Sequence, residues 1–414
     1  MKVLQPLLIF MIALEIFSCT KHYPQQDNAT ATGDNLNGMF YINAEGMFIK
    51  LNPASDSIYW TSEVLSLANS YHNPIAFDSS YFYFGNYNSL FCYSANAGLP
   101  VWSFSWYAFN DAITYREPAF KDSLIFFTSP TSMWDNSYLF CKNKVTGKGY
   151  WSQQIDNGYV SIGFNSIPVV YNNKVITLTR DQNNHKYITA YSVQNGALQW
   201  STAVGDSTSS KLWVTEGKIC SAYGSEAICL NASTGQFLWK TKLDIPSSWF
   251  TYNFIEDGKL VIVKVLSNSS YKILRLEIGN GTLISLQTID VPTTYASNPQ
   301  HISPVGCCYG GNKLYIASFY SFDSLDIFSY NLQNEKRLWQ IRLPASIQAE
   351  QAPLLTDKYV IFPINNNYNG PSLSYMVFLD LSGKLVKKLP FKFRDTNGFV
   401  YKENGVTYTQ PPYF

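Results

Sequence analysis

Two cysteines, Cys220 and Cys229, stand nine positions apart on either side of the dipeptide Gly224-Ser225. A Gly-Ser pair with glycine first is typical of a type II′ hairpin turn. Counting outward from this turn, Cys220 faces Cys229 at a non-hydrogen-bonded position, where paired Cα atoms lie about 4.5 Å apart. That distance is near the short end of disulfide geometry. The pair is therefore either a disulfide within one hairpin or two neighbouring thiols.

A second pair of thiols, Cys307 and Cys308, is adjacent in sequence and lies just before Gly310-Gly311. Adjacent thiols can be oxidised to a disulfide, which raises the question of redox chemistry. Two small residues buried in a strand would give the same pattern. The sequence leaves both interpretations open.

The sequence offers few other arrangements of residues that could carry catalysis. The four histidines lack the spacing of metal ligands, and no phosphate loop or nucleophile elbow is present. Asp111, Arg116 and Glu117 share one long loop, but their spacing does not make an acid–base pair. The oxygen-rich segments DQNNHK and INNNYNG lack the ordered ligand spacing of a calcium loop. We therefore predict no catalytic residue, no metal and no cofactor.

Composition limits the classes of partner. The formal net charge of the 414-residue chain is +1, and no block of Lys and Arg is long enough for an electrostatic nucleic-acid site. Aromatic residues make up 16% of the chain, with 30 Tyr and 27 Phe, which favours strands over helices. After the N-terminal segment, no stretch approaches the roughly 18 apolar residues that span a bilayer.

The N-terminus has the pattern of a secretory signal. Residues 1–18 contain an early lysine followed by an apolar stretch, and they end in front of Cys19 in a way that resembles the lipobox of bacterial lipoproteins. That resemblance implies lipidation of Cys19; a plain secretory signal is the alternative. Residues 19–37 are polar and aperiodic, which predicts a flexible tether. Thr20 after the cysteine favours the outer membrane.

One unit recurs along the chain and supplies the elements that must position these groups. A tryptophan returns eight residues after a small polar residue, and four copies have a glycine four residues before it. The recurring tryptophans are Trp60, Trp102, Trp151, Trp200, Trp239 and Trp339. Two degenerate copies have Ser285 or Lys387 in the tryptophan position. Eight units follow, spaced 39 to 54 residues apart.

Each unit has the pattern of four short antiparallel strands. An apolar strand, a tight polar turn and a second strand appear in IPVVYNNKVITL; a third strand, such as ITAYS, precedes the strand with the tryptophan. No stretch combines a helical period with helix caps. We predict an all-β, eight-bladed β-propeller of four-stranded antiparallel blades over residues 38–414, with seven blades as the alternative.

The units resemble the PQQ-type propeller repeat of the quinoprotein alcohol dehydrogenase-like family. The family pattern is Leu-Tyr-Ala-Leu-Asp, a Thr-Gly turn and a strand ending in Trp; AICLNASTGQFLW, ITAYSVQNGALQW and LFCKNKVTGKGYW match it. The resemblance covers about residues 38 to 414 and is specific for fold rather than for function. It implies that each tryptophan lies on the outermost strand and docks between blades, where a large aromatic ring buries much surface.

The first unit lacks its innermost strand, whereas the chain ends on strand-like sequence without a blade, NGFVYKENGVTYTQPP. We predict that this C-terminal segment completes the first blade. The ring would then have no open joint, and sheet edges there would be paired.

The position of a cysteine within its unit helps to distinguish its role. Cys92, Cys141 and Cys229 occupy one position, which holds Ala190 or Ser329 in other units, so this position accepts small buried side chains. We expect Cys92 and Cys141 to be free structural thiols.

Quinone-dependent alcohol dehydrogenases of the resembling family carry a vicinal disulfide against their cofactor. The resemblance therefore makes a PQQ-dependent dehydrogenase that uses Cys307 and Cys308 an alternative function. Two departures weigh against it. The chain is shorter than such enzymes, and no run of acidic, Asn and Arg residues matches their calcium and quinone ligands.

Alternating strands place the tight turns on one face of the ring and the longer, aromatic loops on the other. Function on rigid scaffolds tends to lie in such loops. The predicted contact residues are Trp106, Tyr107, Trp134, Trp249, Phe250, Tyr252 and Tyr320. The alternative is that these rings plug the mouth of the channel or pack on one another.

The favoured function is a non-catalytic, lipid-anchored scaffold. Within the family, the chain looks most like the propeller lipoprotein of the outer-membrane β-barrel assembly machinery (BamB-like). This likeness implies a monomer at the outer membrane, facing the periplasm or the cell surface, that binds envelope proteins through its aromatic loops. The alternatives are the quinoprotein dehydrogenase and a carbohydrate-binding lipoprotein.

Overall fold

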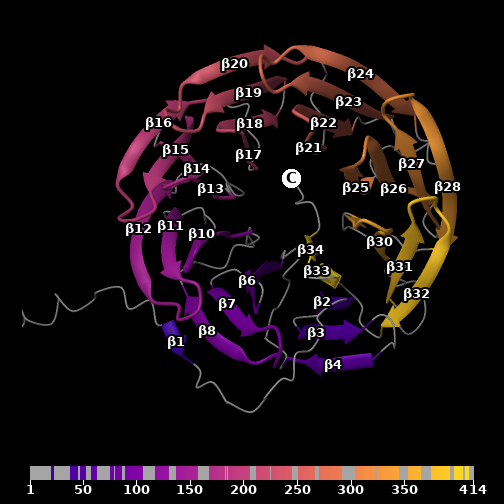
Figure 1. The fold of residues 1–414 in the computed structure, drawn as a ribbon, viewed down its shortest axis with the longest axis horizontal. Helices are drawn as coiled ribbons and strands as arrows, with labels where there is room; N and C mark the ends of the chain where they lie inside the picture. Colours follow the sequence, from indigo (N-terminus) through magenta and orange to yellow (C-terminus); the bar gives the residue numbers. More distant parts are fainter. Residues whose placement is uncertain are drawn as a thin grey trace, which may run out of the picture.

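Eight antiparallel sheets stand side by side around a central axis and form a closed ring. Figure 1 shows each blade with its first strand near the axis and its last strand on the rim. The predicted all-β, eight-bladed propeller is confirmed, and the seven-bladed alternative is wrong. No helix is present among the described residues, so none there could cross a membrane.

The structure is a computed structural model that describes residues 20–22 and most of residues 38–409. The gaps within the second range are 45–46, 53–56, 63–74, 79, 86–88, 106–116, 130–136, 157–166, 182, 184, 206–210, 224, 245–249, 266–269, 291–303, 322–323, 345–352, 365–373, 392–395 and 404–405. The predicted signal peptide, Cys19 and most of the predicted tether lie outside the described residues.

The strands of the first four blades follow one another from the axis to the rim. Blade 1 contains β33 (Thr396–Glu403), β2 (Met39–Ala44), β3 (Met47–Asn52) and β4 (Ser57–Thr61). Blade 2 contains β5 (Ala76–Asp78), β6 (Tyr81–Gly85), β7 (Ser89–Ser94) and β8 (Pro100–Ser105). Blade 3 contains β9 (Ala119–Lys121), β10 (Leu124–Thr128), β11 (Ser137–Asn143) and β12 (Gly149–Asp156). Blade 4 contains β13 (Val169–Tyr171), β14 (Lys174–Arg180), β15 (Lys186–Ser192) and β16 (Leu198–Ala203).

The other four blades have the same order of strands. Blade 5 contains β17 (Trp213–Thr215), β18 (Lys218–Tyr223), β19 (Glu226–Asn231) and β20 (Phe237–Lys242). Blade 6 contains β21 (Phe250–Glu256), β22 (Lys259–Val265), β23 (Ser270–Glu277) and β24 (Leu283–Asp290). Blade 7 contains β25 (Pro304–Gly310), β26 (Lys313–Ser321), β27 (Ser324–Asn331) and β28 (Lys336–Pro344). Blade 8 contains β29 (Leu354–Leu355), β30 (Tyr359–Ile364), β31 (Ser374–Asp380) and β32 (Leu385–Phe391).

The C-terminal segment closes the ring, as predicted. Strand β33 pairs antiparallel with β2, with Met39 opposite Lys402 and Ala44 opposite Thr396. A further strand, β34 (Val406–Thr409), pairs with β33 and lies closer to the axis (Figure 1). The chain ends are thus joined within one sheet rather than by contact between two blades.

The short strand β1 (Thr20–His22) pairs with the outer edge of β8. Figure 1 shows it on the rim beside blade 2. The sequence predicts a tether without regular structure over residues 19–37, and these three residues depart from that expectation. Their backbone pairs with β8, an outer strand whose edge N–H and C=O groups would otherwise be unpaired.

The core lies between the blades, which explains why the middle strands are apolar on both faces. Along β22, Leu260 and Ile262 pack toward blade 5, whereas Val261 and Val263 pack toward blade 7. Successive side chains of a strand point to opposite faces, so a blade between two neighbours needs an unbroken apolar run.

The recurring tryptophans dock one blade on the next. Trp239 of β20 donates its Nε1–H to the carbonyl of Ile278 in blade 6 at 2.8 Å. Its ring lies against Gly281, where an added Cβ would be 2.6 Å from Trp239 Cδ2. The same indole hydrogen bond joins Trp102 to Lys144, Trp151 to Val193 and Trp339 to Leu381. Trp60 and Trp200 lie against Gly98 and Gly235, and no partner for their buried Nε1 is found among the described residues.

Blade 6 has Ser285 in the tryptophan position and uses a different donor. Gln287, two residues further along β24, donates its side-chain N–H to the carbonyl of Leu332 in blade 7 at 2.7 Å. Leu332 follows the third strand of its blade, as Ile278 does in blade 6. A carboxamide therefore replaces an indole on the same type of carbonyl, and the joint keeps its hydrogen bond without the large ring.

One buried cation interrupts the apolar joint between blades 2 and 3. The side chain of Lys142 on β11 is 5% exposed, and its Nζ lies 3.6 Å from the ring centroid of Phe104 on β8. The carbonyl of Gly147 accepts a hydrogen bond from this Nζ at 3.5 Å. Burial lowers the pKa of Lys142 to about 8.

Replacing Lys142 by methionine is expected to raise the free energy of unfolding at pH 7 by about 2 kcal/mol, because burial of the ammonium costs energy that its ring contact only partly offsets. A base with a lowered folded-state pKa destabilises the fold below that pKa. Between pH 8 and the unfolded value of 10.5 the folded chain releases its proton first, so this destabilisation fades as pH rises. Denaturant unfolding at pH 7 and pH 10.5 should therefore show the two proteins converging. A gap that is independent of pH would contradict the assignment.

Candidate functional site

Most of the predicted aromatic contact residues cannot be placed. Trp106, Tyr107, Trp134 and Trp249 lie outside the described residues. The backbone of Phe250 begins β21, and that of Tyr320 lies near the end of β26. The predicted use of these six residues in binding partners stays a prediction.

The prediction that Tyr252 lies in an aromatic contact loop is wrong. It lies within β21 rather than in a loop, its side chain is 2% exposed, and it packs in the core between blades 6 and 7. Burial, with a smaller effect of the Cys307 thiol, raises the pKa of its hydroxyl. The alternation of Phe250, Tyr252 and Phe254 is the sequence signal for a strand, but the aromatic content of the segment suggests a loop.

The thiols of Cys220 and Cys229 lie together between blades 5 and 6. The hairpin has the predicted register, with Cys220 opposite Cys229, and the two Sγ atoms are 3.1 Å apart. Both are free and buried in an apolar cluster. The S–H hydrogen bond to Cys229, together with burial, raises the pKa of Cys220. The same hydrogen bond lowers the pKa of Cys229. Because both thiols are buried in an apolar cluster, we assign the pair to packing.

Cys307 and Cys308 point into different cores. Cys307 belongs to the cluster between blades 6 and 7, and Cys308 to the cluster between blades 7 and 8. Burial raises the pKa of both thiols. Neither is more than 4% exposed. The two thiols therefore do not form a shared wall against which a quinone could lie, and the described residues do not fit a PQQ site built on this pair.

No group of three or more metal-ligating side chains occurs among the described residues. One buried carboxylate, Asp326, is held in an ion pair within blade 7. Nε and Nη2 of Arg342 donate hydrogen bonds to the carboxylate of Asp326, at 2.7 and 3.0 Å. Gln340 donates a third hydrogen bond to the same carboxylate at 2.8 Å, so this acid is fully engaged in joining β27 to β28.

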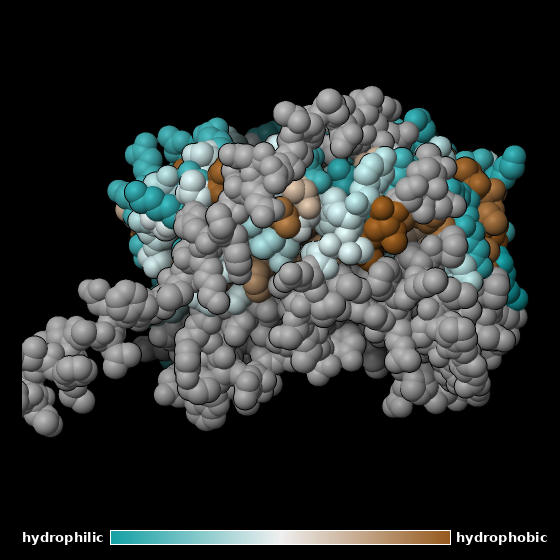
Figure 2. Space-filling model, turned by 90° about the horizontal axis from the view of Figure 1, so that it is seen from below, coloured by the Kyte–Doolittle hydropathy of each residue, from teal (hydrophilic) through white to brown (hydrophobic). Residues whose placement is uncertain are grey.

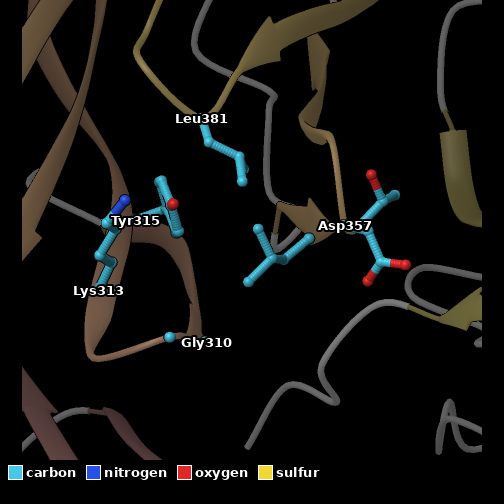
Figure 3. Close-up of a pocket in the computed structure, with 8 residues that line it drawn as sticks. Gly310, Lys313, Tyr315, Asp357 and Leu381 are labelled. Carbon is cyan, nitrogen blue, oxygen red and sulfur yellow. The ribbon is translucent and has the colours of Figure 1, made fainter.

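A cavity of about 340 Å³ opens at the turn face between blades 7 and 8 (Figure 3). In blade 2, Asp78 ends the first strand and forms a 2.7 Å ion pair with Lys144 of blade 3. Gly310 occupies the equivalent position in blade 7, and it has no side chain that could reach blade 8. Leu355 uses part of the room, because a Cβ on Gly310 would lie 2.6 Å from its Cδ2.

The lining of this cavity suits an amphipathic contact. Lys313 and Tyr315 come from β26 on one side, Asp357 lies on the other side, and Leu381 lies above the space between them (Figure 3). The apolar Leu355 also lines the cavity. Burial raises the pKa of Tyr315 to about 12, so its hydroxyl is neutral at physiological pH. Charges of both signs around an apolar floor can hold a side chain of a partner.

Exposed apolar side chains gather on the rim of the ring. Among the residues that the structure describes, the large hydrophobic side chains that are substantially exposed all lie on an outer strand or in the turn before it: Ile58, Tyr59, Leu99, Val145, Tyr150, Leu198, Phe237, Leu238, Leu283, Ile284, Leu286, Leu338, Leu385 and Val386. Brown apolar groups are visible between polar ones on the side of the molecule that Figure 2 shows. Single exposed residues are ordinary, but clusters mark surfaces for protein contact.

Among the described residues, blades 5 and 6 carry more of these exposed side chains than any other two neighbouring blades. Strand β24 exposes Leu283, Ile284 and Leu286 to 46, 44 and 48%, and the neighbouring β20 exposes Phe237 and Leu238 to 45 and 44%. We call these five residues the blade 5–6 rim patch. The loss of the docking tryptophan in blade 6 and the apolar surface of the same strand occur together, a feature that the repeat pattern alone does not reveal.

Comparison with known proteins identifies a family whose model matches most of this chain. The family model described as outer membrane protein assembly factor BamB matches residues 88–210 and 184–368. The predicted PQQ-type propeller repeat is thereby confirmed. No curated protein matches the chain significantly in sequence.

Solved structures with the same fold are distant in sequence. The dihydro-heme d1 dehydrogenase NirN superimposes with a TM-score of 0.63 at 12% identity, covering 93% of this chain and 80% of NirN. Sqt1 of Saccharomyces cerevisiae superimposes with a TM-score of 0.54 at 12% identity, covering 83% and 97%. A europium-containing methanol dehydrogenase gives 0.52 at 12% identity, covering 78% and 79%. At such identities the likeness shows the fold alone.

Proposed function

We propose that this chain is a non-catalytic scaffold for protein partners in the cell envelope. It belongs to the family described as outer membrane protein assembly factor BamB. The family match carries the proposal. The blade 5–6 rim patch supports it, since a rigid ring with an exposed apolar cluster is suited to holding another protein. A lipid anchor on Cys19 would keep the scaffold at the outer membrane.

Affinity purification of the full-length chain from solubilised envelopes tests the proposal. We expect one or a few envelope proteins to co-purify, and replacement of Leu286 by lysine to reduce their recovery at least tenfold, because the substitution places a charge within the patch. Leu385→Lys on blade 8 is the matched control, since Leu385 is a leucine on an outer strand with the same exposure, 48%. Recovery of no envelope protein by the wild type would contradict the scaffold role. Equal losses in the two variants would place the contact elsewhere.

The quinoprotein dehydrogenase is the competing function. Two of the similar structures are dehydrogenases, but the likeness extends to the fold only. Incubation with PQQ and calcium, followed by absorbance spectroscopy and dye reduction with primary alcohols, separates the two functions. A quinone spectrum with alcohol-dependent dye reduction would favour the enzyme over the scaffold.

A further inference from the structure

We propose that a polar cavity between blades 3 and 4 binds an uncharged saccharide. The cavity has a volume of about 350 Å³, within the lower range of small-ligand sites. It is lined by β12 of blade 3 and by β14, β15 and β16 of blade 4. This site is separate from the blade 5–6 rim patch, so the inference does not depend on the scaffold role.

The first reason is that this joint has a pair of hydroxyl groups at two facing positions where no other blade has two. Thr177 and Thr189 lie opposite each other on the face of blade 4 that packs toward blade 3. In blade 8 the same pair of positions holds Phe362 and Val377. In the remaining six blades these positions carry Ile42 and Ile49, Phe84 and Phe91, Phe127 and Phe140, Ser221 and Ile228, Ile262 and Leu274, or Ile316 and Phe328. Packing of a propeller does not require hydroxyl groups here, so their presence needs another explanation.

The second reason is the order of the hydroxyl groups. Thr179 Oγ1 lies 2.7 Å from Thr189 Oγ1, which lies 2.9 Å from Ser201 Oγ. These three hydroxyls form a chain across three strands, and its direction can reverse because each group both donates and accepts. The ends of the chain can therefore offer either a donor or an acceptor. Sugar hydroxyls have the same dual character.

The third reason is a fixed carboxylate at the mouth. Asp181 follows β14 and accepts hydrogen bonds from the backbone N–H groups of Asn183 and His185 and from the hydroxyl of Tyr187, at 2.8, 3.0 and 3.0 Å. Burial opposes its ionisation, but these bonds and one with the His185 ring hold its pKa at about 2. These four bonds fill the acceptor positions of the carboxylate, so Asp181 holds the mouth of the cavity in a fixed shape and leaves ligand binding to the hydroxyl chain.

Apolar groups complete the match to a sugar ring. Ile155 is 3% exposed on the blade 3 side, Tyr191 is 8% exposed beneath the hydroxyl chain, and Leu198 is 62% exposed at the rim. A pyranose ring presents hydroxyls at its edge and C–H groups on its faces, which suits a site with both kinds of wall. Hydroxyl groups outnumber charged groups in the lining, so an uncharged ligand fits better than an anion.

Saturation-transfer NMR with the full-length chain tests this site, using methyl α-D-glucopyranoside, methyl α-D-mannopyranoside and N-acetyl-D-glucosamine as probes. We expect at least one of them to bind with a millimolar Kd, and Thr189→Val to weaken that binding at least tenfold. The isosteric change breaks the hydroxyl chain at its middle. Thr288→Val, an exposed threonine on β24, is the matched control and should bind like the wild type.

Thermal melting shows whether Thr189→Val is folded. Ser201→Ala, at the accessible end of the hydroxyl chain, provides a second test if it is not. The proposal is overturned if none of the three probes binds. It is also overturned if Thr189→Val and Ser201→Ala bind as tightly as the wild type, which would place the sugar elsewhere on the ring.

Discussion

A chain that lacks residues 395–414 is expected to be unfolded or insoluble, because the deletion removes the strand that joins the last blade to the first. Strand β33 covers β2 along six residue pairs, from Met39–Lys402 to Ala44–Thr396. Its Tyr401 is 4% exposed and packs against Phe40 in a tilted arrangement, with the ring centroids 4.8 Å apart.

The expected loss is comparable to the whole stability of the fold. Tyr401, Phe40 and Phe378 belong to the core cluster between blades 8 and 1. Removing β33 exposes this cluster, and it leaves β2 with an unpaired inner edge. The free energy of unfolding of an ordinary folded domain is only about 5–15 kcal/mol. Loss of most of the apolar burial at one joint is comparable to this amount.

A shorter truncation is the control. A chain that ends after Glu403 loses β34, which pairs only with β33 within its sheet, but keeps the closing strand. We expect this variant to be soluble and to melt within a few degrees of the full-length chain. Circular dichroism and calorimetric melts of the three proteins measure the difference. If the chain without residues 395–414 melts cooperatively at the wild-type temperature, the ring does not depend on β33.

The features that the sequence predicts well are those in which a local pattern fixes a local structure. The Gly224-Ser225 turn determines the register of its hairpin, and so the pairing of Cys220 with Cys229 can be counted residue by residue. The number of blades follows because seven of the eight copies of the unit each hold the four strands of one sheet, and the first copy holds three. Closure by β33 follows because a unit without an inner strand needs one.

The features that the sequence does not predict depend on which side chains meet across a joint. Thr179, Thr189 and Ser201 are separated by up to 22 positions, and each is unremarkable in its own strand. They form a chain only because three strands align with one face toward blade 3. In the same way, Gln287 takes over the role of a tryptophan from a position two residues away, which an alignment on the tryptophan position passes over.

Replacing Gly281 by alanine is expected to lower the free energy of unfolding by about 3–4 kcal/mol, through two separable effects. The φ angle of Gly281 is +72°, a left-handed conformation that costs an L-residue about 1–2 kcal/mol. In addition, the new Cβ would lie 2.6 Å from Trp239 Cδ2 and 2.7 Å from Thr241 Oγ1. The tryptophan would have to move, and its 2.8 Å hydrogen bond to the Ile278 carbonyl would be weakened or lost.

Gly258→Ala isolates the conformational effect. Gly258 has nearly the same φ, +71°, but no atom within 4 Å of the position of its Cβ. We therefore expect a loss of about 1 kcal/mol for Gly258→Ala, and the excess for Gly281→Ala measures the contact with the tryptophan. Equal losses at the two glycines in denaturant unfolding would mean that the indole does not rest on Gly281.

Combining Gly281→Ala with Trp239→Ala completes the test. Trp239→Ala alone is expected to cost about 3–5 kcal/mol, as for other buried large aromatic residues. Once the ring is absent, the close contact that remains for the alanine Cβ is with Thr241 Oγ1, whose side chain can rotate away, so Gly281→Ala should cost little more than Gly258→Ala. The two changes would then be non-additive by about 2 kcal/mol, the size expected for residues in direct contact. Such coupling would show that the recurring glycine and the recurring tryptophan form one contact between neighbouring blades. It would also explain why the glycine stands before the tryptophan in its own unit yet serves the tryptophan of the unit before it.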